Sequence, residues 1–305
     1  MSALAPSLTS EAYRGAADLP ALLAFAARFM AERWPMESIW HPGDIVWQLK
    51  PDYDAAKPIR LWSEGGAPLA MSMFTAADEF WIDSRSEDVA AAVIAKAEGL
   101  AAKAGAQRLA VRAWESDAAR AATLARLGYA WGEGGPIFRF DLSGDLPPVR
   151  LESGFTARDS VGLDPEARAK CHRDAWDHLE HLGIEGRSSF STEVYRALAA
   201  APLYDPALDI VIAAPDGELV ANALAWADPV SGVGNFEPVG ASGAYRGRGF
   251  GRAAVVEGLH RLKAAGMRWA RVGTAHFNAP AIATYLSSGF EITDRGALWT
   301  KALAA

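Results

Sequence analysis

The chain has 305 residues, half of them apolar and 22% charged, and its formal net charge is −7. This length exceeds what one compact core usually fills, so we expect two domains. The acidic charge argues against a general nucleic-acid-binding protein, whose binding domain would be basic, and is compatible with a cationic substrate such as an amine.

Cysteine content and apolar runs restrict the class of protein further. The one cysteine, Cys171, leaves no partner for an intrachain disulfide and no cysteine cluster for zinc. Residues 1–10 lack the charged region and apolar core of a signal peptide, and no apolar run is long enough to span a membrane. We therefore expect a cytoplasmic enzyme or binding protein, a monomer or homodimer, with no nucleic-acid or membrane partner.

The first half of the chain alternates strand-like and helix-like segments, which predicts an α/β fold. A Gly65-Gly66 turn separates the first two strands. The expected strands cover 58–64, 68–74, 79–83 and 107–113, and the expected helices cover 88–105 and a segment that leads into 127–131.

Residues 142–150, LSGDLPPVR, combine a glycine with a pair of prolines and predict a linker. We therefore expect one domain over 1–145 and a second over 146–305. The second domain has the same order of elements as the first. Its expected strands cover 208–215, 219–227, 234–240, 268–275 and a segment from 289, and its helices close at Gly266 and begin at Pro280.

Two glycine pairs give the two halves a common register. Gly105 and Gly266 are 161 residues apart, and so are Gly128 and Gly289. A fixed separation of this kind is typical of an internal repeat, so the sequence predicts two copies of one α/β unit.

The stretch YRGRGFGRA, residues 245–253, places three arginines and three glycines immediately before a helix. Glycines let backbone N–H groups approach a phosphate, and the helix N-terminus and the arginines attract its charge. The motif therefore predicts a phosphate or pyrophosphate site, with a solvated surface turn as the plainer alternative.

Other readings of the glycines fit less well. Gly249-x-Gly251-x-x-Ala254 satisfies the dinucleotide fingerprint, but it follows several strands and no acidic residue occurs in 268–275, where one would be needed. The segment from Gly240 to Ala244 approaches a serine-hydrolase elbow but ends in alanine, and no kinase-type Gly-Lys-Ser/Thr follows the glycines.

The Arg246-x-x-Gly249-x-Gly251 spacing, followed by Asn278, Tyr285 and Gly289-Phe290, resembles the GCN5-related N-acetyltransferase (GNAT) family. The resemblance implies a mixed sheet flanked by helices, in two tandem GNAT-like domains, and acetyl-coenzyme A as cofactor. The residues that it assigns to the cofactor are Val239, Gly240, Ala241, Arg246, Gly247, Arg248, Gly249, Phe250, Gly251, Arg252, Asn278 and Ala281.

The resemblance also implies roles in N-acetyl transfer. Tyr285 matches the family's general acid, since a neutral phenol can donate a proton to a thiolate. Glu237 is the candidate base, because strand alternation is expected to place it on the face of Val239 and Ala241. Asn278 is expected to cap the following helix as well.

The acceptor, a small-molecule amine or a protein amine, is expected to meet the first helices of the second half. The candidates are Trp176, Asp177, His178 and His181. The two histidines lie three apart on a helix, but no third ligand is matched to them, so we expect no metal.

The first half departs from the motif. The separation of 161 residues puts Asp88 and Ala90 opposite the glycines of the loop, Leu124 opposite Tyr285 and Asp117 opposite Asn278. We therefore expect domain 1–145 to be a degenerate copy without cofactor and domain 146–305 to be catalytic. A non-catalytic acyl-coenzyme A sensor and a nicotinamide-dependent oxidoreductase are the alternatives.

Overall fold

The computed structural model describes residues 7–34, 39–50, 52–55, 57–177, 179, 183, 186 and 188–303. They form two compact units. The first unit comprises Met1–Pro42, Tyr53–Gly135 and Asp294–Ala305, and the second comprises Gly43–Asp52 and Pro136–Thr293. The units therefore differ from the expected division at residues 145 and 146, because two segments belong to the unit built by the other half of the sequence.

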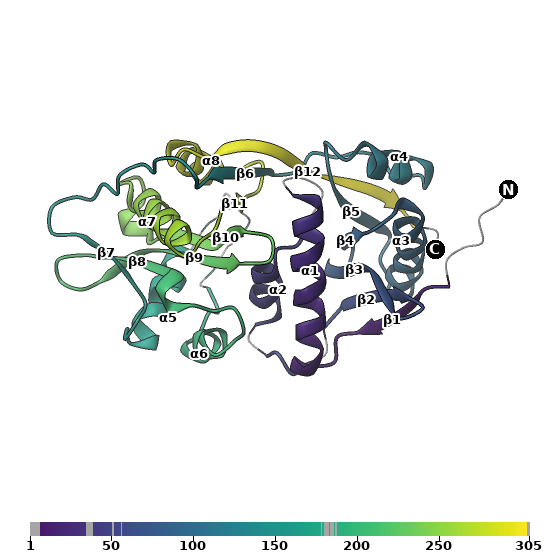
Figure 1. Cartoon of the computed structure of the whole chain (residues 1–305), viewed down its shortest axis with the longest axis horizontal. Coiled ribbons are helices and arrows are strands. Elements are labelled where there is room, and N and C mark those ends of the chain that lie inside the picture. Colours follow the sequence, from purple (N-terminus) through teal and green to yellow (C-terminus); the bar gives the residue numbers. More distant parts are fainter. Residues whose placement is uncertain are drawn as a thin grey trace. The chain divides into compact units, whose positions relative to one another are not determined.

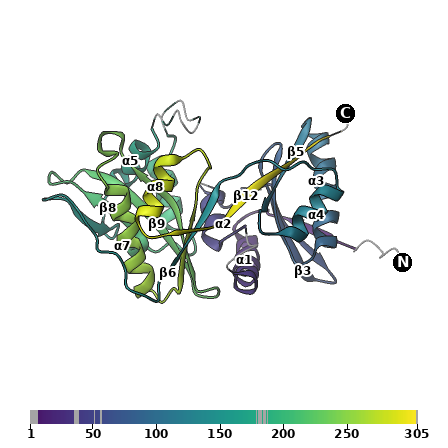
Figure 2. The ribbon, with the colours of Figure 1, turned by 90° about the horizontal axis from the view of Figure 1, so that it is seen from above.

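The first unit is a mixed sheet with helices packed on it (Figure 1). Its strands lie in the order β1-β2-β3-β4-β5-β12, and only the β4–β5 pair is parallel among the pairings described. Helices α3 and α4 pack against each other (Figure 2). The elements are β1 (Thr9–Ala12), η1 (Ala16–Asp18), α1 (Leu19–Arg33), β2 (Ile59–Glu64), β3 (Ala67–Ala76), β4 (Glu79–Ser84), α3 (Glu87–Lys103), β5 (Arg108–Trp114), α4 (Ala118–Arg126) and β12 (Glu291–Ala302).

The second unit contains a second mixed sheet, in the order β7-β8-β9-β10-β11-β6. The β10–β11 pair is parallel and the other described pairs are antiparallel. The expected α/β class with a mixed sheet is confirmed. The elements are α2 (Pro42–Leu49), β6 (Pro136–Asp141), β7 (Thr156–Asp159), α5 (Pro165–Ala175), α6 (Thr192–Ala199), η3 (Pro206–Leu208), β8 (Asp209–Ala213), β9 (Leu219–Asp228), β10 (Val233–Ala241), η4 (Gly243–Tyr245), α7 (Phe250–Ala264), β11 (Trp269–Gly273) and α8 (Ala279–Ser287).

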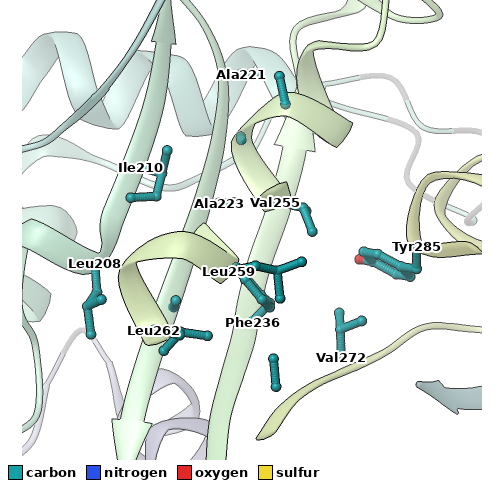
Figure 3. Packing of buried hydrophobic residues seen from close by; sticks show 14 of the residues in the cluster. Leu208, Ile210, Ala221, Ala223, Phe236, Val255, Leu259, Leu262, Val272 and Tyr285 are labelled. Carbon is teal, nitrogen blue, oxygen red and sulfur yellow. The ribbon is translucent and has the colours of Figure 1, made fainter. Parts of the chain in front are cut away.

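Helix α7 covers one face of the second sheet, with Val255, Leu259 and Leu262 buried on the stripe that its spacing predicts (Figure 3). The side chains of β9 alternate between the two faces. Ala223 packs in the α7 core, whereas Asn222 donates a hydrogen bond to the Cys171 carbonyl of α5 on the other face. The sheet is thus sandwiched between α7 and α5.

The last strand of each sheet comes from the half of the sequence that builds most of the other unit. Strand β6 pairs with β11, from Asp141↔Trp269 to Ile137↔Gly273. Strand β12 pairs with β5 over residues 296–302. This exchange of strands explains why a boundary at the linker does not separate the units. Within the described ranges, no helix combines the length and apolar character that crossing a membrane requires.

Candidate active site

Strands β10 and β11 separate part of the way along their length. Their described pairing stops at Asn235↔Arg271, whereas β10 remains paired to β9 as far as Ala241. Beyond this point lies a cavity of about 660 Å³, lined by parts of α5, β10, the 242–249 loop, α7 and α8. The edge of β10 that faces β11 is therefore available to bond an extended ligand as another strand would.

A bulge interrupts β10 between Phe236 and Val239. Both of these side chains pack in the α7 core, although strict alternation would put them on opposite faces. Strict alternation, on which the expectation for Glu237 depends, therefore does not hold in this part of β10. The bulge could not be read from the sequence, because it depends on how β10 pairs with β9.

Glu237 lies close to charged side chains of α2 and β11. Burial and the neighbouring Asp44 raise its pKa to about 7, against the opposing influence of Lys50 and Arg271. A carboxyl group with this pKa loses its proton near neutral pH, which is suited to a general base. The Glu237 backbone carbonyl accepts a hydrogen bond of 2.8 Å from the Trp226 indole, which holds this part of β10 in place.

Tyr285 projects from α8 toward α7 and lines the cavity (Figure 3). It is only 5% exposed, and its ring centroid lies 5.3 Å from that of Phe138 and 6.2 Å from that of Phe290. Burial and the negative charge of Glu237 raise the pKa of its hydroxyl above the ordinary value. The phenol therefore stays protonated at neutral pH and can act as a donor.

The glycine loop has the backbone form that an anion site requires. Gly247 and Gly249 adopt left-handed φ angles of 78° and 85°, which favour glycine. A Cβ atom added at either residue, or at Gly251, would meet nothing within 4 Å, so space lies beside the backbone. Gly249 is the N-cap of α7 and offers no side-chain cap, and no acidic residue lies in the first turn. The N-terminus of α7 can therefore receive an anion.

The three arginines of this loop are engaged with other protein groups. Arg246 donates to the backbone carbonyls of Ala175 (3.1 Å), Asp177 (3.3 Å) and Ala241 (3.3 Å), so it holds the loop against the end of α5. Arg248 forms an ion pair with Glu152.

Arg252 donates to the Ser287 carbonyl at 2.8 Å and thereby links α7 to α8. Backbone N–H groups, rather than the guanidinium groups, are left as the main donors of the loop.

Asn278 caps α8, as its position predicts. Its Oδ1 accepts a hydrogen bond from the Ala281 N–H at 3.4 Å, and its Nδ2 donates to Thr274 at 3.0 Å. Asn278 and Ala281 both line the cavity opposite the glycine loop.

Two of the expected acceptor residues can be placed. Trp176 lines the cavity directly after α5, and its buried Nε1 has no hydrogen-bond partner among the described residues. Asp177 follows it and offers its carbonyl to Arg246. His178 and His181 lie outside the described residues. Within the described ranges, no three His, Cys, Asp or Glu side chains are grouped to hold a metal ion.

Sequence reasoning missed the contribution of α2. Asp44 accepts hydrogen bonds from Asn235 of β10 at 2.7 Å and from Arg271 of β11 at 2.9 Å. These contacts bring Lys50 within electrostatic reach of Glu237. No local pattern marks residues so distant in sequence as neighbours.

The first unit has a closed counterpart of this site. Strands β4 and β5 also pair only briefly, at Glu79↔Ala110 and Phe80↔Val111. However, only Arg85 and Ser86 connect β4 to α3, whereas residues 242–249 connect β10 to α7. A separation of 161 residues also puts Arg85 opposite Arg246, but this correspondence fails, because most of the loop of the second unit has no counterpart in the first.

The comparisons with known proteins agree with this geometry. Residues 173–290 match the model of the acetyltransferase (GNAT) family. The mycothiol acetyltransferase of Thermomonospora curvata is 31% identical over 151 residues, which cover 48% of this chain and 47% of that protein. That of Kytococcus sedentarius is 32% identical over 151 residues, covering 48% and 49%. The match thus spans about half the length of these curated relatives.

Two solved structures resemble the whole chain. A tandem GNAT protein from the clavulanic acid biosynthesis pathway has a TM-score of 0.65 at 17% identity and covers 98% of this chain and 99% of its own. A GCN5-related N-acetyltransferase from Sphaerobacter thermophilus has a TM-score of 0.63 at 18% identity, with coverages of 99% and 98%. At these identities the likeness shows the fold, which is a tandem one.

Proposed function

Because the chain belongs to the acetyltransferase (GNAT) family, we propose that it transfers an acetyl group from acetyl-coenzyme A to an amine. The observation that carries this proposal is the cavity of the second unit, which joins the open N-terminus of α7 to the splayed edge of β10 and to Tyr285. On β10, Glu237 precedes by two residues Val239, the first residue of this strand that lines the cavity.

The residues present fit this cofactor. The N–H groups of the glycine loop and of the first turn of α7 would hold the pyrophosphate, and the free edge of residues 239–241 would bond the pantetheine arm. Asn278 and Ala281 would line the opposite wall. Acetyl-coenzyme A, when bound, supplies the acetyl group as a thioester, which the amine attacks to form an amide and release a thiol.

Two side chains would move the protons of this reaction. Glu237 would accept a proton from the amine as the new N–C bond forms, directly or through water. Tyr285 would give its hydroxyl proton to the sulfur as the C–S bond breaks, because its raised pKa keeps it protonated. The acceptor is a small-molecule amine or a protein amine. Since the curated relatives are named mycothiol acetyltransferase, amines related to mycothiol belong in the panel of acceptors that tests this proposal.

The test is thiol release from acetyl-coenzyme A in the presence of a panel of amines, with the product identified by mass spectrometry. We expect kcat/KM to rise through about pH 7 as Glu237 loses its proton, well below the ionisation of an ordinary alkylamine. Glu237→Gln should remove this limb, and Glu291→Gln, an exposed carboxylate on β12, should leave it in place.

Three outcomes would contradict the proposal. An unchanged limb in Glu237→Gln would mean that another base acts. Binding of acetyl-coenzyme A without thiol release from any amine would indicate a sensor. Calorimetric binding of NAD(P)H in preference to coenzyme A would indicate an oxidoreductase.

A further inference from the structure

Polar contacts of Asp44 fix helix α2 to the sheet of the second unit. Asp44 accepts from Asn235 at 2.7 Å and from Arg271 at 2.9 Å, and Arg271 donates to Asn235 at 2.9 Å. Asn235 and Arg271 are 3% and 6% exposed. Asp44 and Arg271 carry opposite charges and form an ion pair, and these contacts hold α2 against the sheet.

Trp47 lies one turn after Asp44 on α2, and Lys50 follows directly after the end of this helix. The buried Trp47 ring packs against His172 and Phe190, with centroid separations of 5.6 Å and 5.8 Å. The Lys50 ammonium lies 3.3 Å from the centroid of the Trp47 ring and donates to the Trp47 carbonyl at 2.7 Å. The position of this ammonium is therefore defined by the fold.

The Trp47 ring is linked to the cavity through His172, whose ring centroid lies 5.9 Å from that of Trp176 in the cavity lining. The Lys50 ammonium beside Trp47 is within electrostatic reach of Glu237. Burial lowers the pKa of Lys50 to about 7, and the nearby Glu237 opposes this effect. Among the described residues, no hydrogen bond or ion pair joins the two side chains. The neighbouring His172 adds no positive charge, because burial and nearby cations lower its pKa well below the ordinary range.

A partly buried amino group and a partly buried carboxyl group each gain from a ligand group of opposite charge. Such pairing favours the protonated form of Lys50 and the ionised form of Glu237. An amine that approaches Glu237 provides the positive group and gives up its proton there. Lys50 has no ion pair among the described residues, so it then gains an anion only if the same molecule brings one.

We propose that the acceptor is an amine that also carries a carboxylate, as free amino acids and their small derivatives do, and that Lys50 binds this carboxylate. The inference rests on the proposed function and narrows its substrate class. Lys50 takes no part in the bond changes, which stay with the amine, the thioester, Glu237 and Tyr285. It is a specificity-determining residue, supplied by a segment from the first half of the sequence.

The test uses matched acceptors with the full chain: each amino acid of a panel, its carboxamide and the amine that remains after loss of the carboxylate. For the preferred acceptor, we expect kcat/KM to be at least tenfold higher with the free carboxylate than with the other two. Lys50→Met keeps the length of the side chain and removes its charge. This variant should lower kcat/KM at least tenfold for the acceptor with a carboxylate, which corresponds to about 1.4 kcal/mol. For the carboxamide, kcat/KM should stay within about threefold of the wild-type value.

Two controls accompany this variant. Lys50→Arg keeps the charge and should restore part of the preference, and Lys103→Met, on α3 of the first unit, should leave it unchanged. The KM for acetyl-coenzyme A should not change in any of the three variants.

The failing outcomes separate the inference from the proposed function. Acetyl transfer without preference for the carboxylate, or an equal loss with every acceptor in Lys50→Met, would overturn the inference alone. If kcat/KM falls equally with every acceptor and its rise with pH is displaced, the role of Lys50 is only to set the pKa of Glu237. No transfer to any amine, with acetyl-coenzyme A still bound, would overturn both.

Discussion

The N-termini of α3 and α7 occupy equivalent places in the two units, and they satisfy their backbone donors in opposite ways. At α3 the Ser86 hydroxyl accepts from the Val89 N–H at 3.3 Å, and Glu87 and Asp88 lie in the first turn. At α7 the N-cap is Gly249, without a side-chain acceptor and without an acidic residue in the first turn. The first helix is capped by its own residues, whereas the second is left for an external anion.

The helices that face these N-termini differ at their third residue. Asp117 caps α4 and Asn278 caps α8 in the same manner, and the third residues are Arg120 and Ala281. Arg120 is 5% exposed and reaches Glu87 at 3.0 Å, the Ser84 hydroxyl at 2.8 Å and the Ile82 carbonyl at 3.3 Å.

Ala281, in contrast, lines the open cavity. The same fold therefore has its site filled by the Arg120 guanidinium in the first unit and open in the second. The difference depends on the loop before the helix and on the residue at the position of Arg120 or Ala281.

The largest effect should come from Tyr285, whose counterpart by sequence spacing is the buried Leu124. Tyr285→Phe should lower kcat by about 10²-fold or more, because the leaving sulfur loses its proton donor, while the KM for acetyl-coenzyme A stays within threefold. Tyr245→Phe is the control, since that tyrosine also lines the cavity but donates its hydroxyl to Glu218. A normal kcat in Tyr285→Phe would assign the proton to another group.

The second-largest effect is expected when the buried arginine of the first unit, Arg120, is introduced at the equivalent position of the second unit, Ala281. Ala281→Arg should lower the affinity for coenzyme A at least thirtyfold, because a guanidinium would fill the cavity wall, and calorimetry would measure it. Arg120→Ala is the converse variant. It should cost about 2 kcal/mol of unfolding free energy in urea, since Glu87 loses its partner while partly exposed to water.

Coenzyme A affinity should not change in Arg120→Ala, and wild type and variant should each saturate at one coenzyme A per chain. A second site in either protein would contradict the assignment of the first unit as closed.

A smaller effect is expected at the start of α7. Gly251→Val should weaken coenzyme A binding about tenfold, or 1.4 kcal/mol, because the added side chain would occupy the space beside the backbone. Gly99→Val in α3 is a matched control, being another helical glycine with nothing within 4 Å of an added Cβ. Equal affinities in the two variants would remove the loop from the binding site.

The smallest effect should be that of Arg248. Its charge is already paired with Glu152, and its guanidinium lies over the rings of Phe155, Tyr245 and Phe250. Arg248→Gln should therefore change coenzyme A affinity less than threefold, measured at low salt where electrostatic effects are greatest. A tenfold loss would show that this arginine leaves Glu152 to bind phosphate.

Local patterns predicted the elements around the site well, because their causes lie close together in sequence. The glycine loop, the cap at Asn278 and the stripe of α7 depend on residues within a few positions of one another. The contacts of Asp44 with Arg271 join residues 227 apart, and no periodicity reports such a pair. The bulge at Glu237 and the partners of β6 and β12 were missed for the same reason.

The exchange of β6 and β12 affects how this protein can be made. On the ribosome, the first unit remains without the strand next to β5 until residues 296–302 have emerged, long after its other strands are complete. The second unit instead uses β6 and α2, which are synthesised before the rest of it. A fragment that begins at residue 146 would therefore lack both a strand beside β11 and the segment Gly43–Asp52, which contains Lys50, although it would hold the entire glycine loop.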